Sequence, residues 1–500
     1  MMASNIEKVF GPPGSGKTTY LLGVVDKELA EGVPSNQIGY FSFTRKASHE
    51  ARDRAVKRFP HLNPKTDFPY FRTLHSLAFQ ALGIKAEYIM QPSNFKEFAA
   101  QAGISVGISS EEDGVSKADN PILNEIDLAR IRGKDLRQHY NESKLDIEWH
   151  HFEFVDRTYR HYKSSRDLLD FTDLLEMIIS QTELLPSLEV VIIDEAQDLS
   201  RLQWQLVEAL AAKAQRVFIA GDDDQAVFTW AGADVNSFLS FNGKIKVLEQ
   251  SYRVPSSVHR LAGSIVKRIR HRQEKQWRPR EFEGSVSTYY RFEDVPVLTG
   301  EWLVLGSTNY LLDPIGAWLK SLGVLYERSG IPSVSPAIVR SVINWERLRK
   351  GQAIPGEEVK EIYRYLDSDN VTRGYRIFKG ELDQLYTSER LMDSFGLKHT
   401  PIWHEAMGKL AHDKRDYLIS ILRHGGKLSN SASIKLSTIH GAKGGEADNV
   451  LLLMDLSPKF MKDAQRNSDD IHRMFYVGVT RARQSLHLVL PKYTDRGFHI

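Results

Sequence analysis

The eight residues from Gly11 to Thr18, which read GPPGSGKT, have the types and spacing of a phosphate-binding turn. Glycines at positions 11, 14 and 16 let the backbone curve so that N–H groups face an anion, Lys17 reaches the terminal phosphates, and the Thr18 hydroxyl binds Mg²⁺. The apolar run before this turn predicts a strand, and TTYLLGVV after it predicts a helix. In that context the motif predicts a nucleoside triphosphate site made of Gly11, Pro12, Pro13, Gly14, Ser15, Gly16, Lys17, Thr18 and Thr19.

A second group of polar residues follows two apolar runs. Asp194 and Glu195 come directly after VVIID, where one carboxylate can bind Mg²⁺ while the other accepts a proton from water. After RVFIA, the segment GDDDQ brings Gln225 close to the nucleotide. Phe228 and Trp230 come next, and the sequence leaves open whether these aromatic rings meet a ligand or belong to the core.

The elements that must position these residues form two sets. Apolar runs at 38–42 and 190–194, and a strand-to-helix junction at 71–79, accompany the strand before Gly11. A second set lies at 301–307, 434–440, 449–455 and 485–491. Because the runs are continuous rather than alternating, they indicate parallel sheets buried on both faces. The fold class is therefore α/β with two parallel sheets.

Two long segments interrupt this pattern. From about residue 80 to 170 the sequence is polar and helix-spaced, with a Gly/Ser/Asp-rich stretch, GISVGISSEEDG, and no clear strand. It predicts a helical insertion with a mobile loop. Helical sequence with Lys and Tyr fills about 335 to 430 of the second set. Each α/β domain is thus expected to carry a mostly helical insertion.

Composition narrows the class of protein further. The chain has 500 residues, with 66 basic and 64 acidic side chains, so any nucleic-acid footprint must be local. A basic run at 267–280 either follows a phosphate backbone or is a solvated helix. There are no cysteines, which excludes disulfides, cysteine zinc sites and iron–sulfur clusters. No leader or membrane-length apolar run is seen, and a cytoplasmic setting without membrane contact is expected.

Nine stretches together resemble the ordered motifs of superfamily 1 DNA helicases of the UvrD/Rep type, in a compact form. They are GPPGSGKT, FSFTRKAS, TLHSLAF, DFTDLL, DEAQD, GDDDQAVFTWAGA, LEQSYRVP, STIHGAKGGEADNV and YVGVTRAR, and they span residues 11 to 483. Two departures stand out. Only ten residues precede Gly11, where relatives carry a glutamine-containing segment that reads adenine, and Gly445 stands where motif V usually has leucine.

The resemblance implies two RecA-like P-loop motor domains. The first would comprise residues 1–79 and 165–248, with an insertion at 80–164. The second would comprise 249–335 and 431–500, with an insertion at 336–430. Such a motor uses ATP and Mg²⁺, moves 3′ to 5′ on single-stranded DNA, and acts at single-strand/duplex junctions with replication, repair or nuclease partners. The same motor acting on RNA, a motor subunit of a nuclease or defence complex, and a nucleotide-switched DNA-binding module are the alternatives.

The resemblance also implies a role for each matching residue. Lys17 and Thr18 would hold phosphate and Mg²⁺, Asp194 would bind Mg²⁺, Glu195 would activate water, and Gln225 would contact the γ-phosphate. The arginine fingers of the second domain would be Arg253 and Arg481, while adenine and ribose would meet Tyr252 and Glu446. Bases would stack on Phe43, Phe228 and Trp230, and DNA phosphates would meet Thr73 and His75.

Overall fold

The structure is a computed structural model. It describes the chain except for residues 1–4, 43–44, 61, 64–65, 111–115, 144, 459 and 463–466, together with the side chains of 45–47, 50, 108–110 and 116–118. The contacts divide the chain into two compact units. The first comprises residues 1–283 and 463–480, and the second comprises residues 284–462 and 481–500. The four-part division predicted from the sequence stays a prediction.

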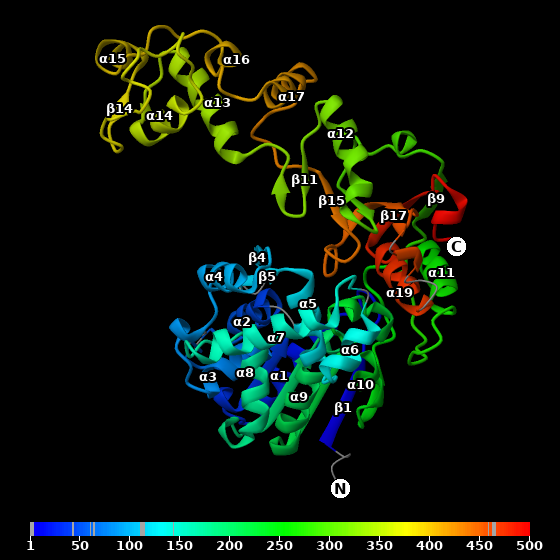
Figure 1. The fold of residues 1–500 in the computed structure, drawn as a ribbon. Coiled ribbons are helices and arrows are strands. Elements are labelled where there is room, and N and C mark those ends of the chain that lie inside the picture. The colour runs from blue at the N-terminus through cyan, green and yellow to red at the C-terminus, as the bar shows by residue number, and fades with distance from the viewer. Residues whose placement is uncertain are drawn as a thin grey trace. The chain divides into compact units, whose positions relative to one another are not determined.

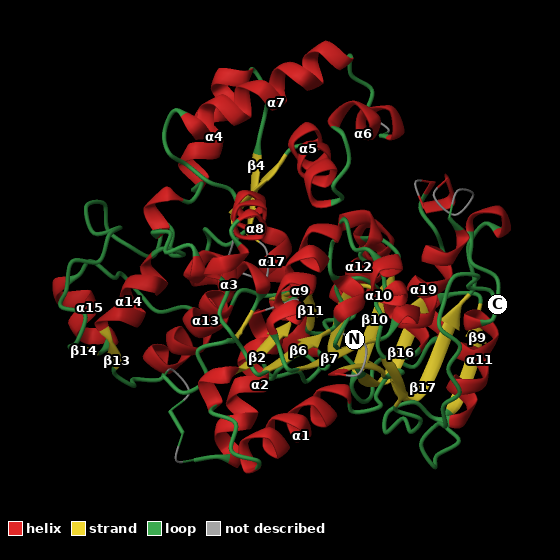
Figure 2. Ribbon diagram, turned by 90° about the horizontal axis from the view of Figure 1, so that it is seen from below, coloured by secondary structure: helices red, strands yellow, loops and turns green. Residues whose placement is uncertain are grey.

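The first unit, drawn mostly in blue to green in Figure 1, is built on a six-stranded parallel sheet with the order β3-β2-β6-β7-β1-β8. Figure 2 labels β2, β6 and β7 of this sheet side by side. Its strands are β1 (Ile6–Phe10), β2 (Ile38–Ser42), β3 (Phe71–Arg72), β6 (Val190–Asp194), β7 (Arg216–Gly221) and β8 (Lys244–Val247). Its helices are α1 (Lys17–Ala30), α2 (Arg45–Arg58), α3 (Leu74–Ala81), α8 (Phe171–Ser180), α9 (Arg201–Lys213) and α10 (Val235–Ser240).

Apolar side chains fill both faces of this sheet. Val190 and Ile192 of β6 pack into one core with α1, whereas Val191 and Ile193 pack into the opposite core with α3, α8 and α9. Neighbouring residues of a strand point to opposite faces, so a continuous apolar run is what two buried faces require. Because β1, β6 and β7 run parallel to one another, their carboxyl ends lie at the same edge of the sheet, and the polar motifs follow these ends.

An inserted subdomain with its own apolar core interrupts the first unit. It contains α4 (Pro92–Ala102), β4 (Gly107–Ser110), β5 (Ser116–Asp119), α5 (Pro121–Ile131), α6 (Leu136–Glu142) and α7 (Trp149–Ser164). The helical prediction is confirmed, but the expectation of no strand is wrong, because β4 and β5 form an antiparallel pair. The sequences of these two strands, GISS and SKAD, are short and lack the alternation of apolar and polar residues by which a strand is predicted.

Two helices complete the first unit. Helix α11 (Ser256–Val266) follows the sheet, and α19 (Ser468–Val479) packs against it from near the end of the chain. These helices belong to the same compact unit as the glycine-rich turn.

The second unit contains a seven-stranded sheet with the order β12-β11-β15-β10-β16-β17-β9. Its strands are β9 (Ser285–Tyr289), β10 (Trp302–Gly306), β11 (Tyr326–Arg328), β12 (Ile331–Pro332), β15 (Ile434–Thr438), β16 (Ala447–Leu453) and β17 (Ala482–Val489). All pairings are parallel except that of β12 with β11. Helix α12 (Asp313–Ser321) contributes to the core on one face. The predicted α/β class with two parallel sheets is confirmed.

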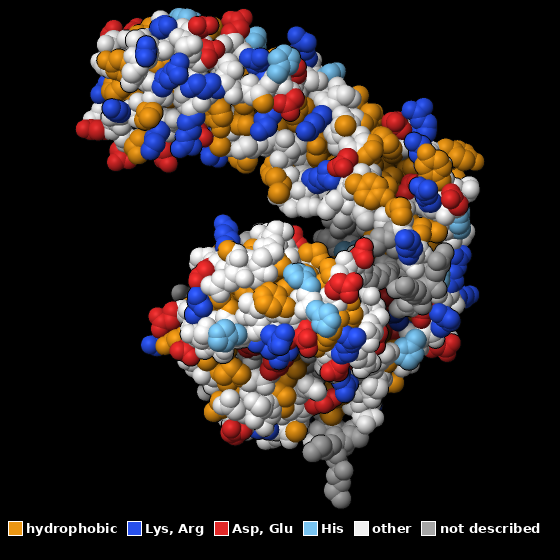
Figure 3. Space-filling model, in the orientation of Figure 1, with side chains coloured by type: hydrophobic (Ala, Val, Ile, Leu, Met, Phe, Trp, Pro, Cys, Tyr) orange, Lys and Arg blue, Asp and Glu red, His pale blue; other side chains and the backbone are white. Residues whose placement is uncertain are grey.

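A helical insertion with a separate core lies within the second unit. Its elements are α13 (Pro336–Arg349), β13 (Ile354–Pro355), α14 (Gly356–Tyr363), β14 (Leu385–Tyr386), α15 (Ser388–Ser394), α16 (Trp403–Ala406) and α17 (His412–Arg423). On the faces visible in Figure 3, acidic and basic side chains are interspersed, in keeping with the small net charge. Among the described residues, no helix combines the length and apolar character needed to cross a bilayer.

Candidate nucleotide and DNA site

The glycine-rich turn runs from the end of β1 into α1 and is shaped by two close approaches. Gly14 has φ +70°, and a Cβ placed there would lie 2.3 Å from Cβ of Arg253. A Cβ at Gly11 would lie 2.0 Å from Cγ of Lys17. Both positions therefore exclude a larger residue. The turn is closed by a hydrogen bond from the N–H of Ser15 to the carbonyl of Pro12.

Two side chains of this turn fit an anion. The buried hydroxyl of Ser15 has no hydrogen-bond partner among the described residues. The Lys17 ammonium donates to the carbonyl of Gly11 at 2.9 Å, so it lies over the turn rather than out in solvent. A buried polar atom without a partner is costly, and a phosphate oxygen would supply one for Ser15. The residues present thus fit a bound triphosphate.

Thr18 and Asp194 come together at the edge of the sheet and fit a magnesium ion. The Thr18 hydroxyl donates to Oδ2 of Asp194 at 3.3 Å, and the hydroxyl of Tyr40 donates to the same oxygen at 2.7 Å. Burial, reinforced by the neighbouring Glu195 carboxylate, raises the pKa of Asp194 to about 6. A cation would oppose this shift, and carboxylate and hydroxyl oxygens are the ligands that Mg²⁺ prefers.

Glu195 has a constrained position after the strand. Its φ of 54° is in the left-handed region, which is uncommon outside glycine. Its N–H donates to Oδ1 of Asp194 at 2.9 Å, and its side chain accepts from Nε2 of Gln197 at 2.5 Å. Gln197 is fully buried and accepts the N–H of Asp222 at 2.9 Å. This glutamine therefore connects the ends of β6 and β7.

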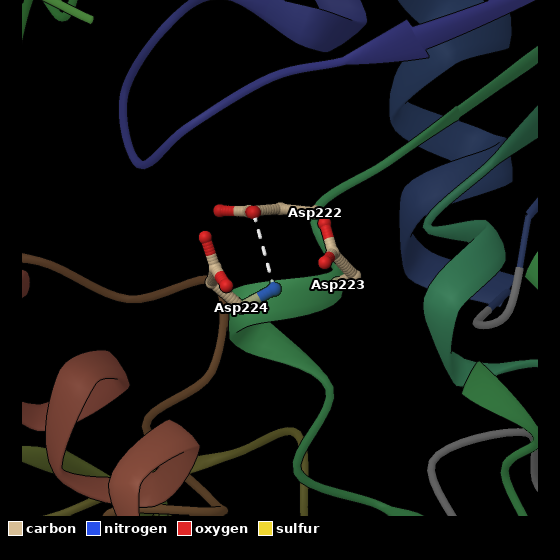
Figure 4. Close-up of side chains that lie close together, drawn as sticks. All are labelled: Asp222, Asp223 and Asp224. Atoms are coloured by element: carbon tan, nitrogen blue, oxygen red, sulfur yellow. Dashed lines mark hydrogen bonds between the residues drawn. The ribbon is translucent and has the colours of Figure 1, made fainter. Parts of the chain in front are cut away.

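Three successive carboxylates follow β7, and Figure 4 shows their side chains close together. Such a group could hold a metal ion, but the Lys275 ammonium lies among them instead. Its Nζ is 3.1 Å from Oδ1 of Asp222 and 2.9 Å from Oδ2 of Asp224, and it also pairs with Asp223. Gln225, which is buried, donates from Nε2 to Oδ2 of Asp222 at 2.6 Å.

The basic run at 267–280 was predicted either to follow a phosphate backbone or to form a solvated helix. It forms no helix, and two of its members bind aspartates within the fold. Helix α11 ends at Val266, so the run is not a helix. Lys275 is fully buried, and Arg272 makes two bonds of 2.7 Å to the Asp224 carboxylate. These two cations neutralise buried aspartates. The sequence of the run does not show this role, because the aspartates that need a cation lie about 50 residues earlier in the chain.

The segment around Arg253, which the resemblance assigned to the second motor domain, belongs to the first compact unit and lies beside the glycine-rich turn, and its role as an arginine finger stays a prediction. The Ser251 hydroxyl donates to the carbonyl of Pro13 at 2.7 Å, and the N–H of Tyr252 donates to the carbonyl of Gly14 at 2.8 Å. The Tyr252 side chain is exposed and Arg253 is half-buried. The physical reason is that β8 runs beside β1, so the chain leaves the sheet next to the turn.

Arg481 and Glu446 belong to the second unit. Arg481 is buried and donates to the carbonyl of Gly445 at 3.2 Å. Glu446 is 3.5 Å from Arg483, which also makes bonds of 2.9 and 2.6 Å to Asp448. The predicted finger and the predicted ribose contact are therefore neighbours at the start of β16 and β17.

The predicted DNA contacts before the insertion differ in their surroundings. Phe43 lies outside the described residues. Thr73 is buried and caps α3, where its hydroxyl accepts the N–H of Ser76 at 3.3 Å. His75 is half-buried and meets the Phe171 ring edge-on, with 6.0 Å between ring centroids. The Thr73 hydroxyl is thus an acceptor within the fold, and this bond does not use its own proton.

Phe228 and Trp230 lie on a short turn before α10. Trp230 is 62% exposed, so it is not a core residue, whereas Phe228 is half-buried. The turn is held by two bonds to Thr229. Its hydroxyl donates to Asp470 at 2.8 Å, and its carbonyl accepts from Arg132 at 3.0 Å. The exposure of the ring contradicts the core interpretation for Trp230, and its contact with a ligand stays a prediction.

Sequence reasoning missed Tyr40, Gln197, Asp222 and Lys275. Gln197 belongs to DEAQD and Asp222 to GDDDQ, but no function was predicted for either residue. Three aspartates directly after an apolar strand were the available signal, because buried carboxylates need a buried cation. Nothing in the sequence indicated that this cation lies 51 residues beyond Asp224.

A glycine-rich turn between a parallel strand and a helix, with a carboxylate and a hydroxyl meeting beside it, defines a P-loop nucleotide-binding protein. Residues 4–246 match the UvrD/REP helicase N-terminal domain, and residues 405–493 match the UvrD-like helicase C-terminal domain. Together these matches cover about two-thirds of the chain. The chain belongs to the UvrD/Rep helicase family.

Individual relatives agree with this family. The chain is 27% identical over 376 residues to the ATP-dependent DNA helicase PcrA of Bacillus subtilis, covering 71% of this chain and 50% of that protein. It is 26% identical over 296 residues to PcrA of Staphylococcus aureus, covering 55% and 40%. It is 24% identical over 375 residues to Rep of Buchnera aphidicola, covering 71% and 54%. The chain thus spans about half the length of the curated relatives it matches.

Proposed function

We propose that this chain is an ATP-dependent DNA helicase or single-stranded DNA translocase that moves 3′ to 5′. The observation that supports it best is the continuous set of contacts beside the glycine-rich turn. Thr18 meets Asp194, Glu195 meets Gln197, and Gln197 and Gln225 both meet Asp222. The names of the relatives, ATP-dependent DNA helicases, supply the substrate class.

In this proposal each residue has a defined task. The N–H groups of the turn, Ser15 and Lys17 bind phosphate, while Thr18 and Asp194 hold Mg²⁺. The metal, when bound, neutralises the charge of the phosphates. Glu195 orients the attacking water and accepts its proton, and the amide of Gln225 contacts the terminal phosphate.

The DNA strand is proposed to stack on the exposed ring of Trp230. Every base has a face that can stack, so this contact suits movement along any sequence. The turn that carries Trp230 begins at Thr229, four residues after Gln225, so the proposed nucleotide and strand contacts lie on one short segment. That continuity is a physical basis for coupling hydrolysis to movement.

The deciding experiment measures ATP hydrolysis alone, with single-stranded DNA and with RNA of equal length, and then strand displacement on duplexes with a 3′ or a 5′ tail. DNA-stimulated hydrolysis with displacement from the 3′ tail is expected. Equal stimulation by RNA would indicate an RNA motor, and DNA binding without stimulated hydrolysis would indicate a nucleotide-switched binding module. Either of these results would refute the proposal.

Glu195→Gln provides the matched variant for this experiment. The amide keeps the shape of the carboxylate but cannot accept the proton, so turnover should fall by about 10²-fold or more while ATP binding persists. Lys17→Ala should instead weaken both binding and turnover, because it removes charge from the phosphate site. Normal hydrolysis by the Glu195→Gln protein would contradict the role of Glu195 as base.

A further inference from the structure

Lys275 is connected to both polar residues proposed to act on the attacking water and the terminal phosphate. Asp222 is the shared partner, since its Oδ1 meets Lys275 at 3.1 Å and its Oδ2 accepts from Gln225 at 2.6 Å. The N–H of Asp222 donates to Gln197, which in turn donates to Glu195. One buried ammonium group therefore lies two contacts away from Gln225 and three from Glu195.

The position of Lys275 is itself fixed from several sides. The N–H of Gln273 donates to Oδ2 of Asp223 at 2.7 Å, and Arg272 binds Asp224 through two bonds. Arg473 of α19 donates to the carbonyl of Asp223 at 2.9 Å and to that of His271 at 2.6 Å. The segment that carries Lys275 is thus bound to the turn after β7 and to α19 together.

We propose that Lys275 is a positioning residue for ATP hydrolysis, which holds the Asp222 carboxylate in the orientation that receives the amide of Gln225. This inference rests on the proposed function. Without the ammonium, Arg272 would still bind Asp224, but the buried Asp222 and Asp223 carboxylates would lose this cation, and the Asp222 carboxylate would turn away from its present position. Gln225 would then lose the carboxylate oxygen that now accepts its amide, and a misplacement of about 1 Å can cost about 10²-fold in rate.

The test compares Lys275→Met with a double variant, Lys275→Met with Asp223→Asn. The second substitution removes one of the two carboxylate charges that remain besides the Arg272-bound Asp224, and so protects folding. In both, kcat for ATP should fall by about 10²-fold while the dissociation constant of a fluorescent ATP analogue changes by less than about threefold. Lys163→Met is the matched control. Its ammonium is also buried between two carboxylates of this unit, Asp170 and Asp173, but has no link to Asp222.

The control should retain its kcat. A folded double variant with wild-type kcat would overturn the proposal, as would an equal loss in the Lys163→Met protein. A crystal structure of the double variant gives a readout that does not depend on activity: the Gln225 side chain should have left Asp222. If the wild-type chain hydrolyses no ATP, the proposed function fails. The positioning role is then judged from that structure, and an unchanged contact of Gln225 with the Asp222 carboxylate would refute it.

Discussion

At the scale of single residues, the raised pKa of Asp194 makes a prediction about pH. The pKa of Asp194 is about 6 in the folded protein, whereas an aspartate in an unfolded chain has a pKa of about 3.9. Between these values the folded protein keeps a proton that the unfolded chain has released, so stability falls as pH rises through this window and is level above it. The loss is about 1.4 kcal/mol per pH unit, or about 3 kcal/mol in total.

Asp194→Asn should lack this part of the pH dependence. Urea unfolding of both proteins in EDTA, between about pH 4 and about pH 7, measures the difference. Adding Mg²⁺ should stabilise the wild type at neutral pH more than the variant, because the metal favours the ionised carboxylate. Parallel stability curves for the two metal-free proteins would contradict the assigned burial cost.

Two glycines of the phosphate-binding turn should respond differently to substitution. Both Gly14 and Gly16 have positive φ, so alanine at either costs about 1–2 kcal/mol in backbone strain. A Cβ at Gly16 has its nearest neighbour at 3.9 Å, whereas one at Gly14 meets Arg253 at 2.3 Å. Gly14→Ala should therefore be the more destabilising of the two in denaturant unfolding. Equal losses would mean that the 251–253 segment moves away at no cost.

At the scale of elements, the turn between β7 and α10 offers a test of the DNA contact. Trp230→Ala should weaken binding to single-stranded DNA by about 1–3 kcal/mol and leave the melting temperature unchanged, because the ring is exposed. Trp204 on α9 is the control, since it is fully buried and its replacement by alanine should cost about 3–5 kcal/mol of stability. A large drop in melting temperature for Trp230→Ala would refute the stacking role.

The salt dependence of DNA binding belongs to the same element. Phosphate contacts made by basic residues release counterions, whereas stacking does not. The Trp230→Ala protein should therefore keep the slope of log affinity against log salt concentration, with its affinities lowered uniformly. Fluorescence titrations at several salt concentrations measure this slope. A changed slope would mean that the substitution disturbs cationic contacts near the turn.

At the scale of the whole molecule, the matched motifs are divided between two units, with the glycine-rich turn in the first and Arg481 in the second. If Arg481 is an arginine finger, Arg481→Ala should lower ATP turnover by about 10³-fold or more with little effect on DNA affinity. Arg483→Ala is the control, because this residue pairs with Asp448 and Glu446 at a half-exposed position. Wild-type turnover in the Arg481→Ala protein would show that hydrolysis does not require it.

The sequence by itself determined the local features of this protein. A strand, a glycine-rich turn and a helix are set by residues close together in the chain, so the phosphate site followed from GPPGSGKT alone. Continuous apolar runs determined the α/β class, because each strand must be covered on both faces. The ordered motifs then indicated the family.

The tertiary structure decided which distant residues meet. The sequence left the basic run that contains Lys275 between a phosphate-backbone contact and a solvated helix, whereas the fold buries Lys275 among three carboxylates after β7. The course of β8 beside β1 likewise decides that Arg253 lies next to Gly14. The antiparallel pair of β4 and β5 was also not predicted, because these polar strands carry no apolar pattern. Contacts between distant residues depend on the packing of whole elements, and the burial that fixes their charge and orientation exists only after that packing has formed.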